Sequence, residues 1–178
     1  MKRLLIVAAC LSIAATTGFG VTLQSMYDKC GPGEGYDKLC VLDPKVKYTG
    51  GCGVLLSKKS CIRGNGALVD LDGGSILGNQ FGTEVTVDGC CLINAGYYGA
   101  VKVEDGAKAI VTGNTITKTN GIAAIYIWLS SSATIKNNII YNSKTYGIAK
   151  HQSSGNVEIL YNDVDMNPGG NYMYYCPG

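Results

Sequence analysis

The chain has 178 residues, of which 46% are hydrophobic and 16% are charged, and it contains 25 Gly but only 4 Pro. Such an apolar fraction excludes an intrinsically disordered chain, and the length suits one domain. The abundance of Gly and the scarcity of charged helix formers argue against long helices and predict an all-β chain.

Residues 1–20 have the pattern of a secretory signal peptide, because Lys2 and Arg3 precede an apolar run over residues 4–15. That run is too short to span a bilayer as an anchor, so we expect no membrane span in the mature chain. The segment ending at Cys10 is similar to a bacterial lipoprotein box, but only six apolar residues precede Cys10 and the run continues past it, which favours ordinary cleavage. The sequence therefore predicts a secreted or cell-surface protein, extracellular or periplasmic.

The expected mature chain carries no net charge. Without Lys2 and Arg3, the 15 basic residues fall to 13 and balance 13 acidic residues, and Arg63 is the one arginine left. Nucleic-acid binding needs clustered Arg and Lys to neutralise phosphates, so this balance excludes nucleic acid as a partner.

Seven cysteines follow the predicted signal peptide. In an exported chain they are candidates for disulfides rather than for zinc, because His151 is the only histidine. The short spacings predict that Cys30 pairs with Cys40 and Cys52 with Cys61. These bridges would staple an N-terminal cap that has little core of its own.

The other cysteines lie near the middle and the end of the chain. Cys90 and Cys91 are neighbours on an expected strand, so one points inward and the other outward. Cys90, in phase with Leu92, is expected to be a buried thiol, whereas Cys91 is a candidate partner of Cys176. Because seven is an odd number, at least one thiol stays free or pairs between chains.

Two internal repeats organise the rest of the chain. In the first, a glycine is followed seven residues later by the glycine of an Asp-Gly pair, and apolar residues alternate between them, which predicts a strand closed by a turn. Its three copies begin at Gly66, Gly82 and Gly99, at nearly equal spacing.

The second repeat places an Asn three residues after an aliphatic residue and two residues before another apolar one. Its asparagines are Asn79, Asn114, Asn138 and Asn162, with Phe81 closing the first copy, and the last three copies follow a constant period of 24. This period, with short strands and no helical pattern, predicts a parallel β-helix of about six coils. Asn suits the left-handed bend between two strands, and its amide can bond to the same amide in the next coil. A leucine-rich repeat and a β-sandwich would show different consensus patterns.

The predicted organisation is a signal peptide over 1–20, an N-terminal cap and first coil over 21–65, β-helix coils over 66–167 and a C-terminal tail over 168–178. In the tail, Tyr172, Tyr174 and Tyr175 are expected to cover the last coil, whose open edge would otherwise invite aggregation.

Residues 133–140 and 61–70 resemble coils of the pectin-lyase-like superfamily. Residues 30–39 are similar to the first strand of those proteins, although the amphipathic capping helix that commonly follows is missing. The resemblance extends over about residues 30–167 and implies an all-β, right-handed parallel β-helix, here with a short disulfide-stapled N-terminal cap. It does not imply one activity, since the superfamily contains lyases, hydrolases, esterases, epimerases and non-enzymatic surface proteins.

Outward positions of the expected coils collect side chains that suit a sugar. Stacking the coils that begin at Gly66, Gly82 and Gly99 places Asp70, Thr86, Lys102 and Tyr126 in one outward column. Glu84, Glu104 and Trp128 are expected close by, with His151 one coil further. Sugar rings pack on aromatic rings and pair their hydroxyls with polar groups, so the predicted substrate-binding residues are Thr86, Tyr126, Trp128 and His151. The alternative is a solvated sheet face on which Lys102 and its neighbouring glutamates neutralise one another.

The candidate catalytic residues are Asp70, Glu84, Lys102 and Glu104, but the chain departs from the enzymes that it resembles. Pectin hydrolases of this superfamily use an adjacent Asp-Asp pair, which does not occur in this sequence. Pectate lyases use a basic residue with calcium held by carboxylates, whereas Arg63 falls in an early coil. Lys102 could act as a base only with a pKa well below about 10.4, and two stacked carboxylates could act on a glycosidic bond.

We therefore expect a secreted β-helix protein that binds a carbohydrate polymer, or acts weakly on it as a polysaccharide lyase or glycoside hydrolase. No cofactor is expected, and no specific motif supports calcium. The alternatives are a non-catalytic, adhesin-like structural solenoid and a fragment of a longer β-helix.

Overall fold

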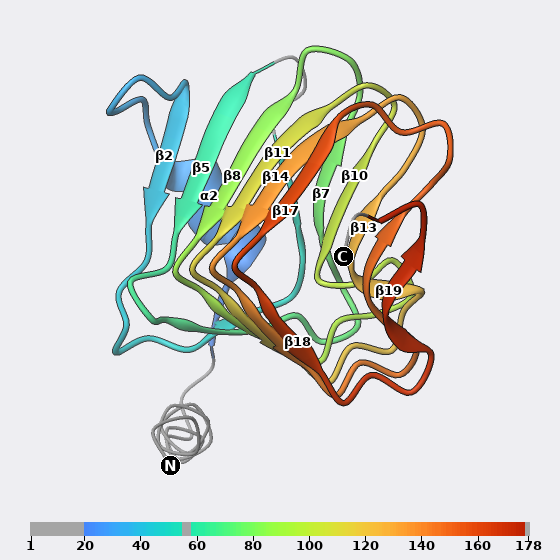
Figure 1. Ribbon diagram of the computed structural model, residues 1–178. Coiled ribbons are helices and arrows are strands. Elements are labelled where there is room, and N and C mark those ends of the chain that lie inside the picture. Colours follow the sequence, from blue (N-terminus) through green and yellow to red (C-terminus); the bar gives the residue numbers. More distant parts are fainter. Residues whose placement is uncertain (1–19, 55–57, 177–178) are drawn as a thin grey trace.

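The computed structural model describes residues 20–54 and 58–176, so the predicted signal peptide, apart from Gly20, lies outside the described residues. The described chain forms a parallel β-solenoid in which each of six coils contributes one strand to each of three sheets (Figure 1). The predicted all-β parallel solenoid is confirmed.

The strands fall into sheets that we number in the order in which each coil visits them. Sheet I contains β2 (Lys38–Val41), β5 (Lys59–Arg63), β8 (Glu84–Asp88), β11 (Lys108–Thr112), β14 (Ser132–Lys136) and β17 (Val157–Leu160). Sheet II contains β1 (Val21–Thr22), β3 (Tyr48–Thr49), β6 (Leu68–Asp70), β9 (Cys91–Ile93), β12 (Thr115–Thr117), β15 (Ile139–Tyr141) and β18 (Asp163–Asp165). Sheet III contains β4 (Cys52–Gly53), β7 (Ile76–Asn79), β10 (Val101–Glu104), β13 (Ala123–Ile127), β16 (Tyr146–Lys150) and β19 (Gly170–Tyr174).

The coils stack in the register that the period of the asparagine repeat requires. In sheet I, Val111 lies opposite Ile135, which lies opposite Ile159 in the next coil. Side chains at such inward positions pack into one continuous hydrophobic core along the axis. The coils begin with β2 and end with β19. They therefore start before residue 66 and end after residue 167, the range predicted for the β-helix coils.

Left-handed residues close two corners in most of the coils. Between sheets I and II these are Asn65, Gly89, Gly113, Asn137 and Tyr161, with φ between 50° and 66°. Between sheets II and III they are Asn94, Lys118, Asn142 and Met166, with φ of 55° or 56°. Asn and Gly tolerate this conformation better than other residues, which explains why they occupy most of these positions.

The predicted asparagine ladder is present at the corner between sheets I and II. The Oδ1 of Asn138 accepts hydrogen bonds from the backbone N–H and the Nδ2 of Asn114, both at 3.0 Å. The Oδ1 of Asn162 accepts the same two bonds from Asn138, at 3.0 and 2.8 Å. Asn79 does not belong to the ladder, because it is exposed at the end of β7 in sheet III, and Phe81 is 82% exposed rather than buried.

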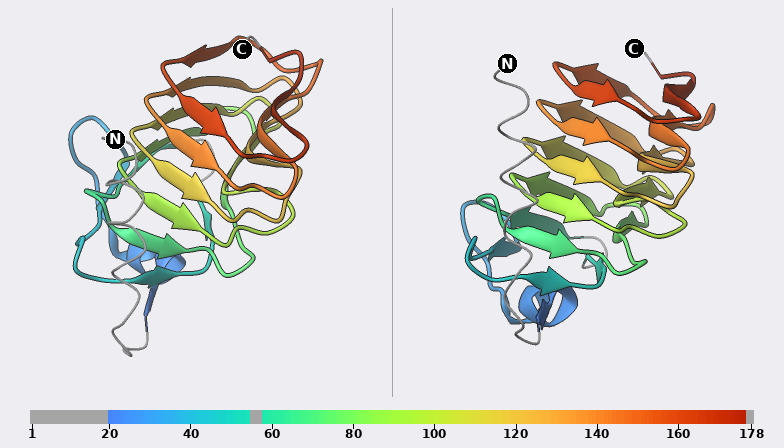
Figure 2. Two further views of the ribbon diagram at one scale, coloured as in Figure 1. Left: turned by 60° about the horizontal axis from the view of Figure 1, so that its bottom comes forward. Right: turned by 90° about the horizontal axis from the view of Figure 1, so that it is seen from below.

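A short helix, α2 (Leu23–Lys29), covers the N-terminal end of the core, and the coils stack from it to β19 (Figure 2). Leu23 and Tyr27 are fully buried, and the Tyr27 hydroxyl lies 2.6 Å from the Ser60 Oγ. Among the described residues no helix follows residues 30–39, as expected, but this helix precedes them, which had not been predicted from the sequence. Its seven residues span too few turns to show a helical repeat.

The structure does not show the predicted disulfide staples: among the described residues Cys30, Cys40, Cys52, Cys61, Cys91 and Cys176 are free cysteines, as is Cys90. Cys52 lies in sheet III and Cys61 in sheet I, so their short spacing does not bring them together. Cys91 belongs to the third coil, whereas Cys176 follows the sixth. The expectation that Cys90 points into the core is confirmed.

The C-terminal tyrosines belong to a regular strand. Residue Tyr172 of β19 pairs with Ile148 of β16 and packs against the core, so this segment completes the sixth coil instead of covering it. Tyr175, just beyond the strand, is 62% exposed. In the part of the chain that the structure describes, no helix is long and apolar enough to cross a membrane.

Candidate functional site

The predicted outward column is wrong, because its residues lie on three different sheets. Asp70 belongs to β6 in sheet II, Glu84 and Thr86 to β8 in sheet I, and Lys102 and Glu104 to β10 in sheet III. Each step of the glycine repeat advances two strands along a coil, and only the longer period of the asparagine repeat returns to the same sheet.

On sheet III, several of the residues predicted to form the column do lie together. Lys102 and Tyr126 lie side by side in register, with Glu104, Trp128 and His151 around them. A loop residue that the sequence had not singled out, Tyr98, joins them. We call the group Tyr98, Lys102, Glu104, Tyr126, Trp128 and His151 the aromatic face.

Lys102 is held inside the aromatic face. Its Nζ lies 2.6 Å from the Glu104 Oε2 and 3.9 Å from the centroid of the Tyr98 ring. The Trp128 ring centroid is 5.3 Å from the same atom, and the residue Lys102 is only 5% exposed. An ammonium group paired and enclosed in this way is a structural cation that fixes the rings by charge pairing and cation–π attraction.

The rings of the aromatic face come from three successive coils: Tyr98 from the third, Tyr126 and Trp128 from the fourth, and His151 from the fifth. Tyr126 and Trp128 stack with centroids 5.7 Å apart and planes 24° apart, and His151 meets Trp128 edge-on at 5.9 Å. Tyr126 is 6% exposed, whereas Trp128 and His151 are half-buried, so the latter two present ring surface to solvent. Tyr126 also packs with Ala123 and Ala149 in an apolar cluster outside the solenoid interior.

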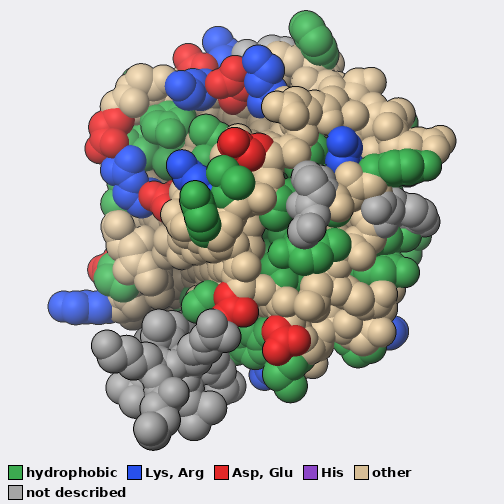
Figure 3. Space-filling view, in the orientation of Figure 1, with side chains coloured by type: hydrophobic (Ala, Val, Ile, Leu, Met, Phe, Trp, Pro, Cys, Tyr) green, Lys and Arg blue, Asp and Glu red, His purple; other side chains and the backbone are tan. Residues whose placement is uncertain are grey.

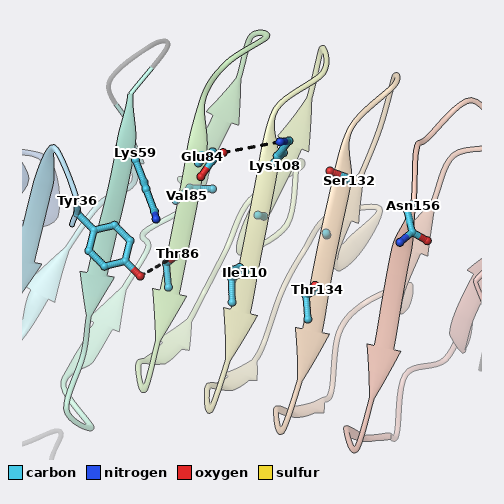
Figure 4. Close-up of a pocket in the computed structure, with 12 residues that line it drawn as sticks. Tyr36, Lys59, Glu84, Val85, Thr86, Lys108, Ile110, Ser132, Thr134 and Asn156 are labelled. Atoms are coloured by element: carbon cyan, nitrogen blue, oxygen red, sulfur yellow. Dashed lines mark hydrogen bonds and ion pairs between the residues drawn. The ribbon is translucent and has the colours of Figure 1, made fainter. Parts of the chain in front are cut away.

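A groove lies on the outer surface of sheet I (Figure 4). This groove of about 310 Å³ crosses several strands and contains the predicted residues Glu84 and Thr86. The Tyr36 hydroxyl donates to the Thr86 Oγ1 at 3.4 Å, and Lys108 lies 3.8 Å from Glu84. On this face, charged side chains of both signs gather near the starts of β5, β8 and β11 (Figure 3).

Asp70 lies apart from both surfaces. Its carboxylate is 3.1 Å from the Lys47 Nζ and accepts a hydrogen bond from the Asn94 Nδ2 at 3.0 Å. Burial alone would raise the pKa of Asp70, but the hydrogen bonds from Asn94, Lys47 and the Asp72 backbone outweigh it and lower the pKa. The carboxylate therefore stays ionised and tied to its neighbours.

The candidate carboxylates do not form a catalytic pair. Asp70, Glu84 and Glu104 point outward from three different sheets, and each has its own lysine partner. Glycoside hydrolysis needs two carboxyl groups that flank one bond, and these three cannot meet across one. Within residues 20–54 and 58–176, no group of three or more His, Cys, Asp or Glu side chains could hold a metal ion.

A family model described as "Right handed beta helix region" matches residues 41–176. The chain therefore belongs to the right-handed β-helix family, and the resemblance to the pectin-lyase-like superfamily is consistent with this. A search of curated proteins and a search of solved structures returned no match.

Proposed function

We propose that this β-helix protein is exported and binds a polysaccharide through the aromatic face of sheet III. The observation that carries the proposal is the row of rings from Tyr98 through Trp128 to His151, in which Tyr98 and Trp128 lie against the buried ammonium of Lys102 and His151 meets Trp128. Successive coils lie about 4.8 Å apart, so a chain molecule running along the axis meets a ring at each step. Export rests on the sequence of residues 1–20.

Ring stacking suits sugars better than it suits most other ligands. The faces of sugar rings are apolar CH surfaces, and half-buried Trp and Tyr rings with polar neighbours accept them well. Around Trp128, Glu104 and His151 supply hydrogen-bonding groups for hydroxyls. We propose binding rather than hydrolysis or elimination, because Lys102 is enclosed and the three candidate carboxylates, Asp70, Glu84 and Glu104, are each paired with a different lysine.

The test is a glycan array with the mature protein, with and without calcium, followed by titration of the best-bound oligosaccharide. Trp128→Ala should weaken binding by about 1 to 3 kcal/mol, the range for losing a stacked aromatic anchor. Tyr161→Ala is the matched control and should keep the affinity. Tyr161 is 85% exposed at the corner between sheets I and II, away from the aromatic face of sheet III.

Fluorescence of the unmodified protein gives a second readout that does not depend on a variant folding. Since Trp128 is the only tryptophan, its emission reports the aromatic face alone. The bound oligosaccharide should protect it from acrylamide quenching. If a glycan binds but the quenching of Trp128 is unchanged and Trp128→Ala keeps the affinity, the glycan binds elsewhere on the protein. If no glycan on the array binds, the structural solenoid becomes the better interpretation.

A further inference from the structure

The charges of the aromatic face are arranged so that the negative one meets solvent. Lys102 and Glu104 form an ion pair at 2.6 Å, but the side chain of Lys102 is 6% exposed and that of Glu104 is 17% exposed. Asp105, the next residue, is exposed and takes part in none of the ion pairs among the described residues. This segment lies beside Trp128, whose backbone N–H donates to Val103 O at 2.7 Å.

The other lysines near sheet III do not reach the rings. Lys118 and Lys144 precede β13 and β16, whereas Trp128 and His151 follow the same two strands. Each strand has five residues and is therefore about 17 Å long. Lys150 pairs in register with the core residue Ile127, so it belongs to the inward positions of the pleat. Among the described residues of sheet III, no lysine or arginine is thus both outward and unpaired.

Toward the C-terminal end, the aromatic face continues as an apolar surface. The outward column that begins with Lys102 and Tyr126 continues in register with Ala149 and Met173. Tyr126 and Ala149 are buried in a small cluster, against which partly buried apolar side chains pack: Ile122, Trp128, Tyr146 and Met173. No member of this cluster carries a charge. Such a surface suits the CH face of a sugar ring but offers nothing to a carboxylate.

We propose that the ligand of the aromatic face is a neutral polysaccharide and not a polyuronate, an inference that rests on the proposed function. Every sugar of a polyuronate carries a carboxylate. Bound here, these groups would lose hydration on an apolar surface without gaining a cation, and those near Trp128 would lie close to Glu104 and Asp105, which repel them. A neutral sugar gives up only the hydration of its hydroxyls, which form hydrogen bonds with Glu104 and His151 instead.

The test compares matched oligosaccharides that differ in charge. One pair is oligogalacturonate and its fully methyl-esterified form, and the other is cellohexaose and the same hexamer with each hydroxymethyl group oxidised to a carboxylate. They are presented on the glycan array and titrated at neutral pH, with the fluorescence of Trp128 as the readout. The neutral member of a pair should bind at least about tenfold more tightly, and its affinity should not change with salt concentration.

The outcomes separate this inference from the proposed function. An acidic member that binds as tightly as its neutral counterpart, or any acidic glycan of the array that Trp128 holds more tightly than the neutral glycans, would overturn the inference and leave carbohydrate binding standing. If no glycan of either kind binds, the proposed function itself is refuted.

A variant tests whether charge is the cause of the preference. Met173→Lys places an ammonium group on the apolar part of the face, so the affinity for oligogalacturonate relative to its methyl ester should rise by about tenfold and become sensitive to salt. The control Met173→Leu keeps the surface apolar and should keep the preference of the parent protein. An unchanged preference in a folded Met173→Lys protein would mean that charge does not exclude acidic sugars, which contradicts the inference. The comparison of matched pairs on the unmodified protein does not depend on the folding of this variant.

Discussion

Replacing Asn138 by Leu tests the ladder that joins the coils at one corner. Asn138 is 1% exposed, and its Nδ2 donates to Val111 O at 2.9 Å, to Lys136 O at 3.0 Å and to the Asn162 Oδ1 at 2.8 Å. Its Oδ1 is the acceptor for the backbone N–H of Asn114. Leucine has a similar size but leaves that buried N–H without a partner, at a cost of about 1 to 3 kcal/mol, and also removes the bonds of the amide nitrogen.

The total expected loss is about 2 to 5 kcal/mol of unfolding free energy, measured by urea unfolding followed by circular dichroism. The matched control is Asn79→Leu, the same substitution at an exposed asparagine, which should change the stability by less than about 0.5 kcal/mol. If the two variants lose equal stability, the ladder contributes nothing beyond the helix or strand preference of Asn. If Asn138→Leu is as stable as the parent protein, the reasoning about orphaned amides is refuted.

Two further predictions concern the cap and the aromatic face. Burial raises the pKa of the Cys40 thiol, and a hydrogen bond with the Cys30 thiol adds to this. Since Cys52 and Cys61 lie on different sheets, mild oxidation should link Cys30 to Cys40 and leave Cys52 and Cys61 unlinked in peptide mass mapping. A Cys52–Cys61 link in folded protein would contradict the placement of those residues on different sheets. Glu104→Gln should destabilise by about 3 to 5 kcal/mol because it leaves the buried Lys102 ammonium unpaired, and adding Lys102→Met should restore most of the loss. A double variant no more stable than the single one would show that the ion pair is not what the site depends on.

The sequence predicted those features of the fold that repeat along the axis. The spacing of Asn114, Asn138 and Asn162 is enough to predict both the coil length and the ladder, since a buried amide needs the same partner in each coil. The alternation around Cys90 and Leu92 likewise predicts which side chains enter the core. Such signals are strong because every coil repeats the same physical requirement.

The assignment of strands to sheets could not be predicted in the same way. The strands that follow Gly66, Gly82 and Gly99 have the same alternation, although they belong to sheets II, I and III. Alternation separates inward from outward positions, but it carries no information about which of three faces is outward. For this reason Lys102 and Tyr126, which are one full coil apart, were correctly placed together, whereas Asp70 and Thr86 were not.

Contacts made by residues in irregular segments could not be predicted from the sequence either. Tyr98 reaches Lys102 from the loop between sheets II and III, and Tyr36 reaches Thr86 from the turn before β2. Neither tyrosine belongs to a repeat, so no spacing relates it to its partner. The only available signal was an aromatic residue beside a glycine in each loop.

The solenoid separates the residues that maintain the fold from those that meet a ligand. An inward residue contacts the coils above and below it, so its replacement disturbs the core, as the stacked positions of Val111, Ile135 and Ile159 show. An outward residue contacts its neighbours on one sheet and the adjoining loops. The outer surfaces accordingly differ: rings lie on sheet III, mixed charge and hydroxyl groups on sheet I, and exposed lysines at the corner between sheets II and III. The repeat specifies the interior of the solenoid but not its ligand. The kind of ligand therefore has to be inferred from the few outward positions at which the coils differ.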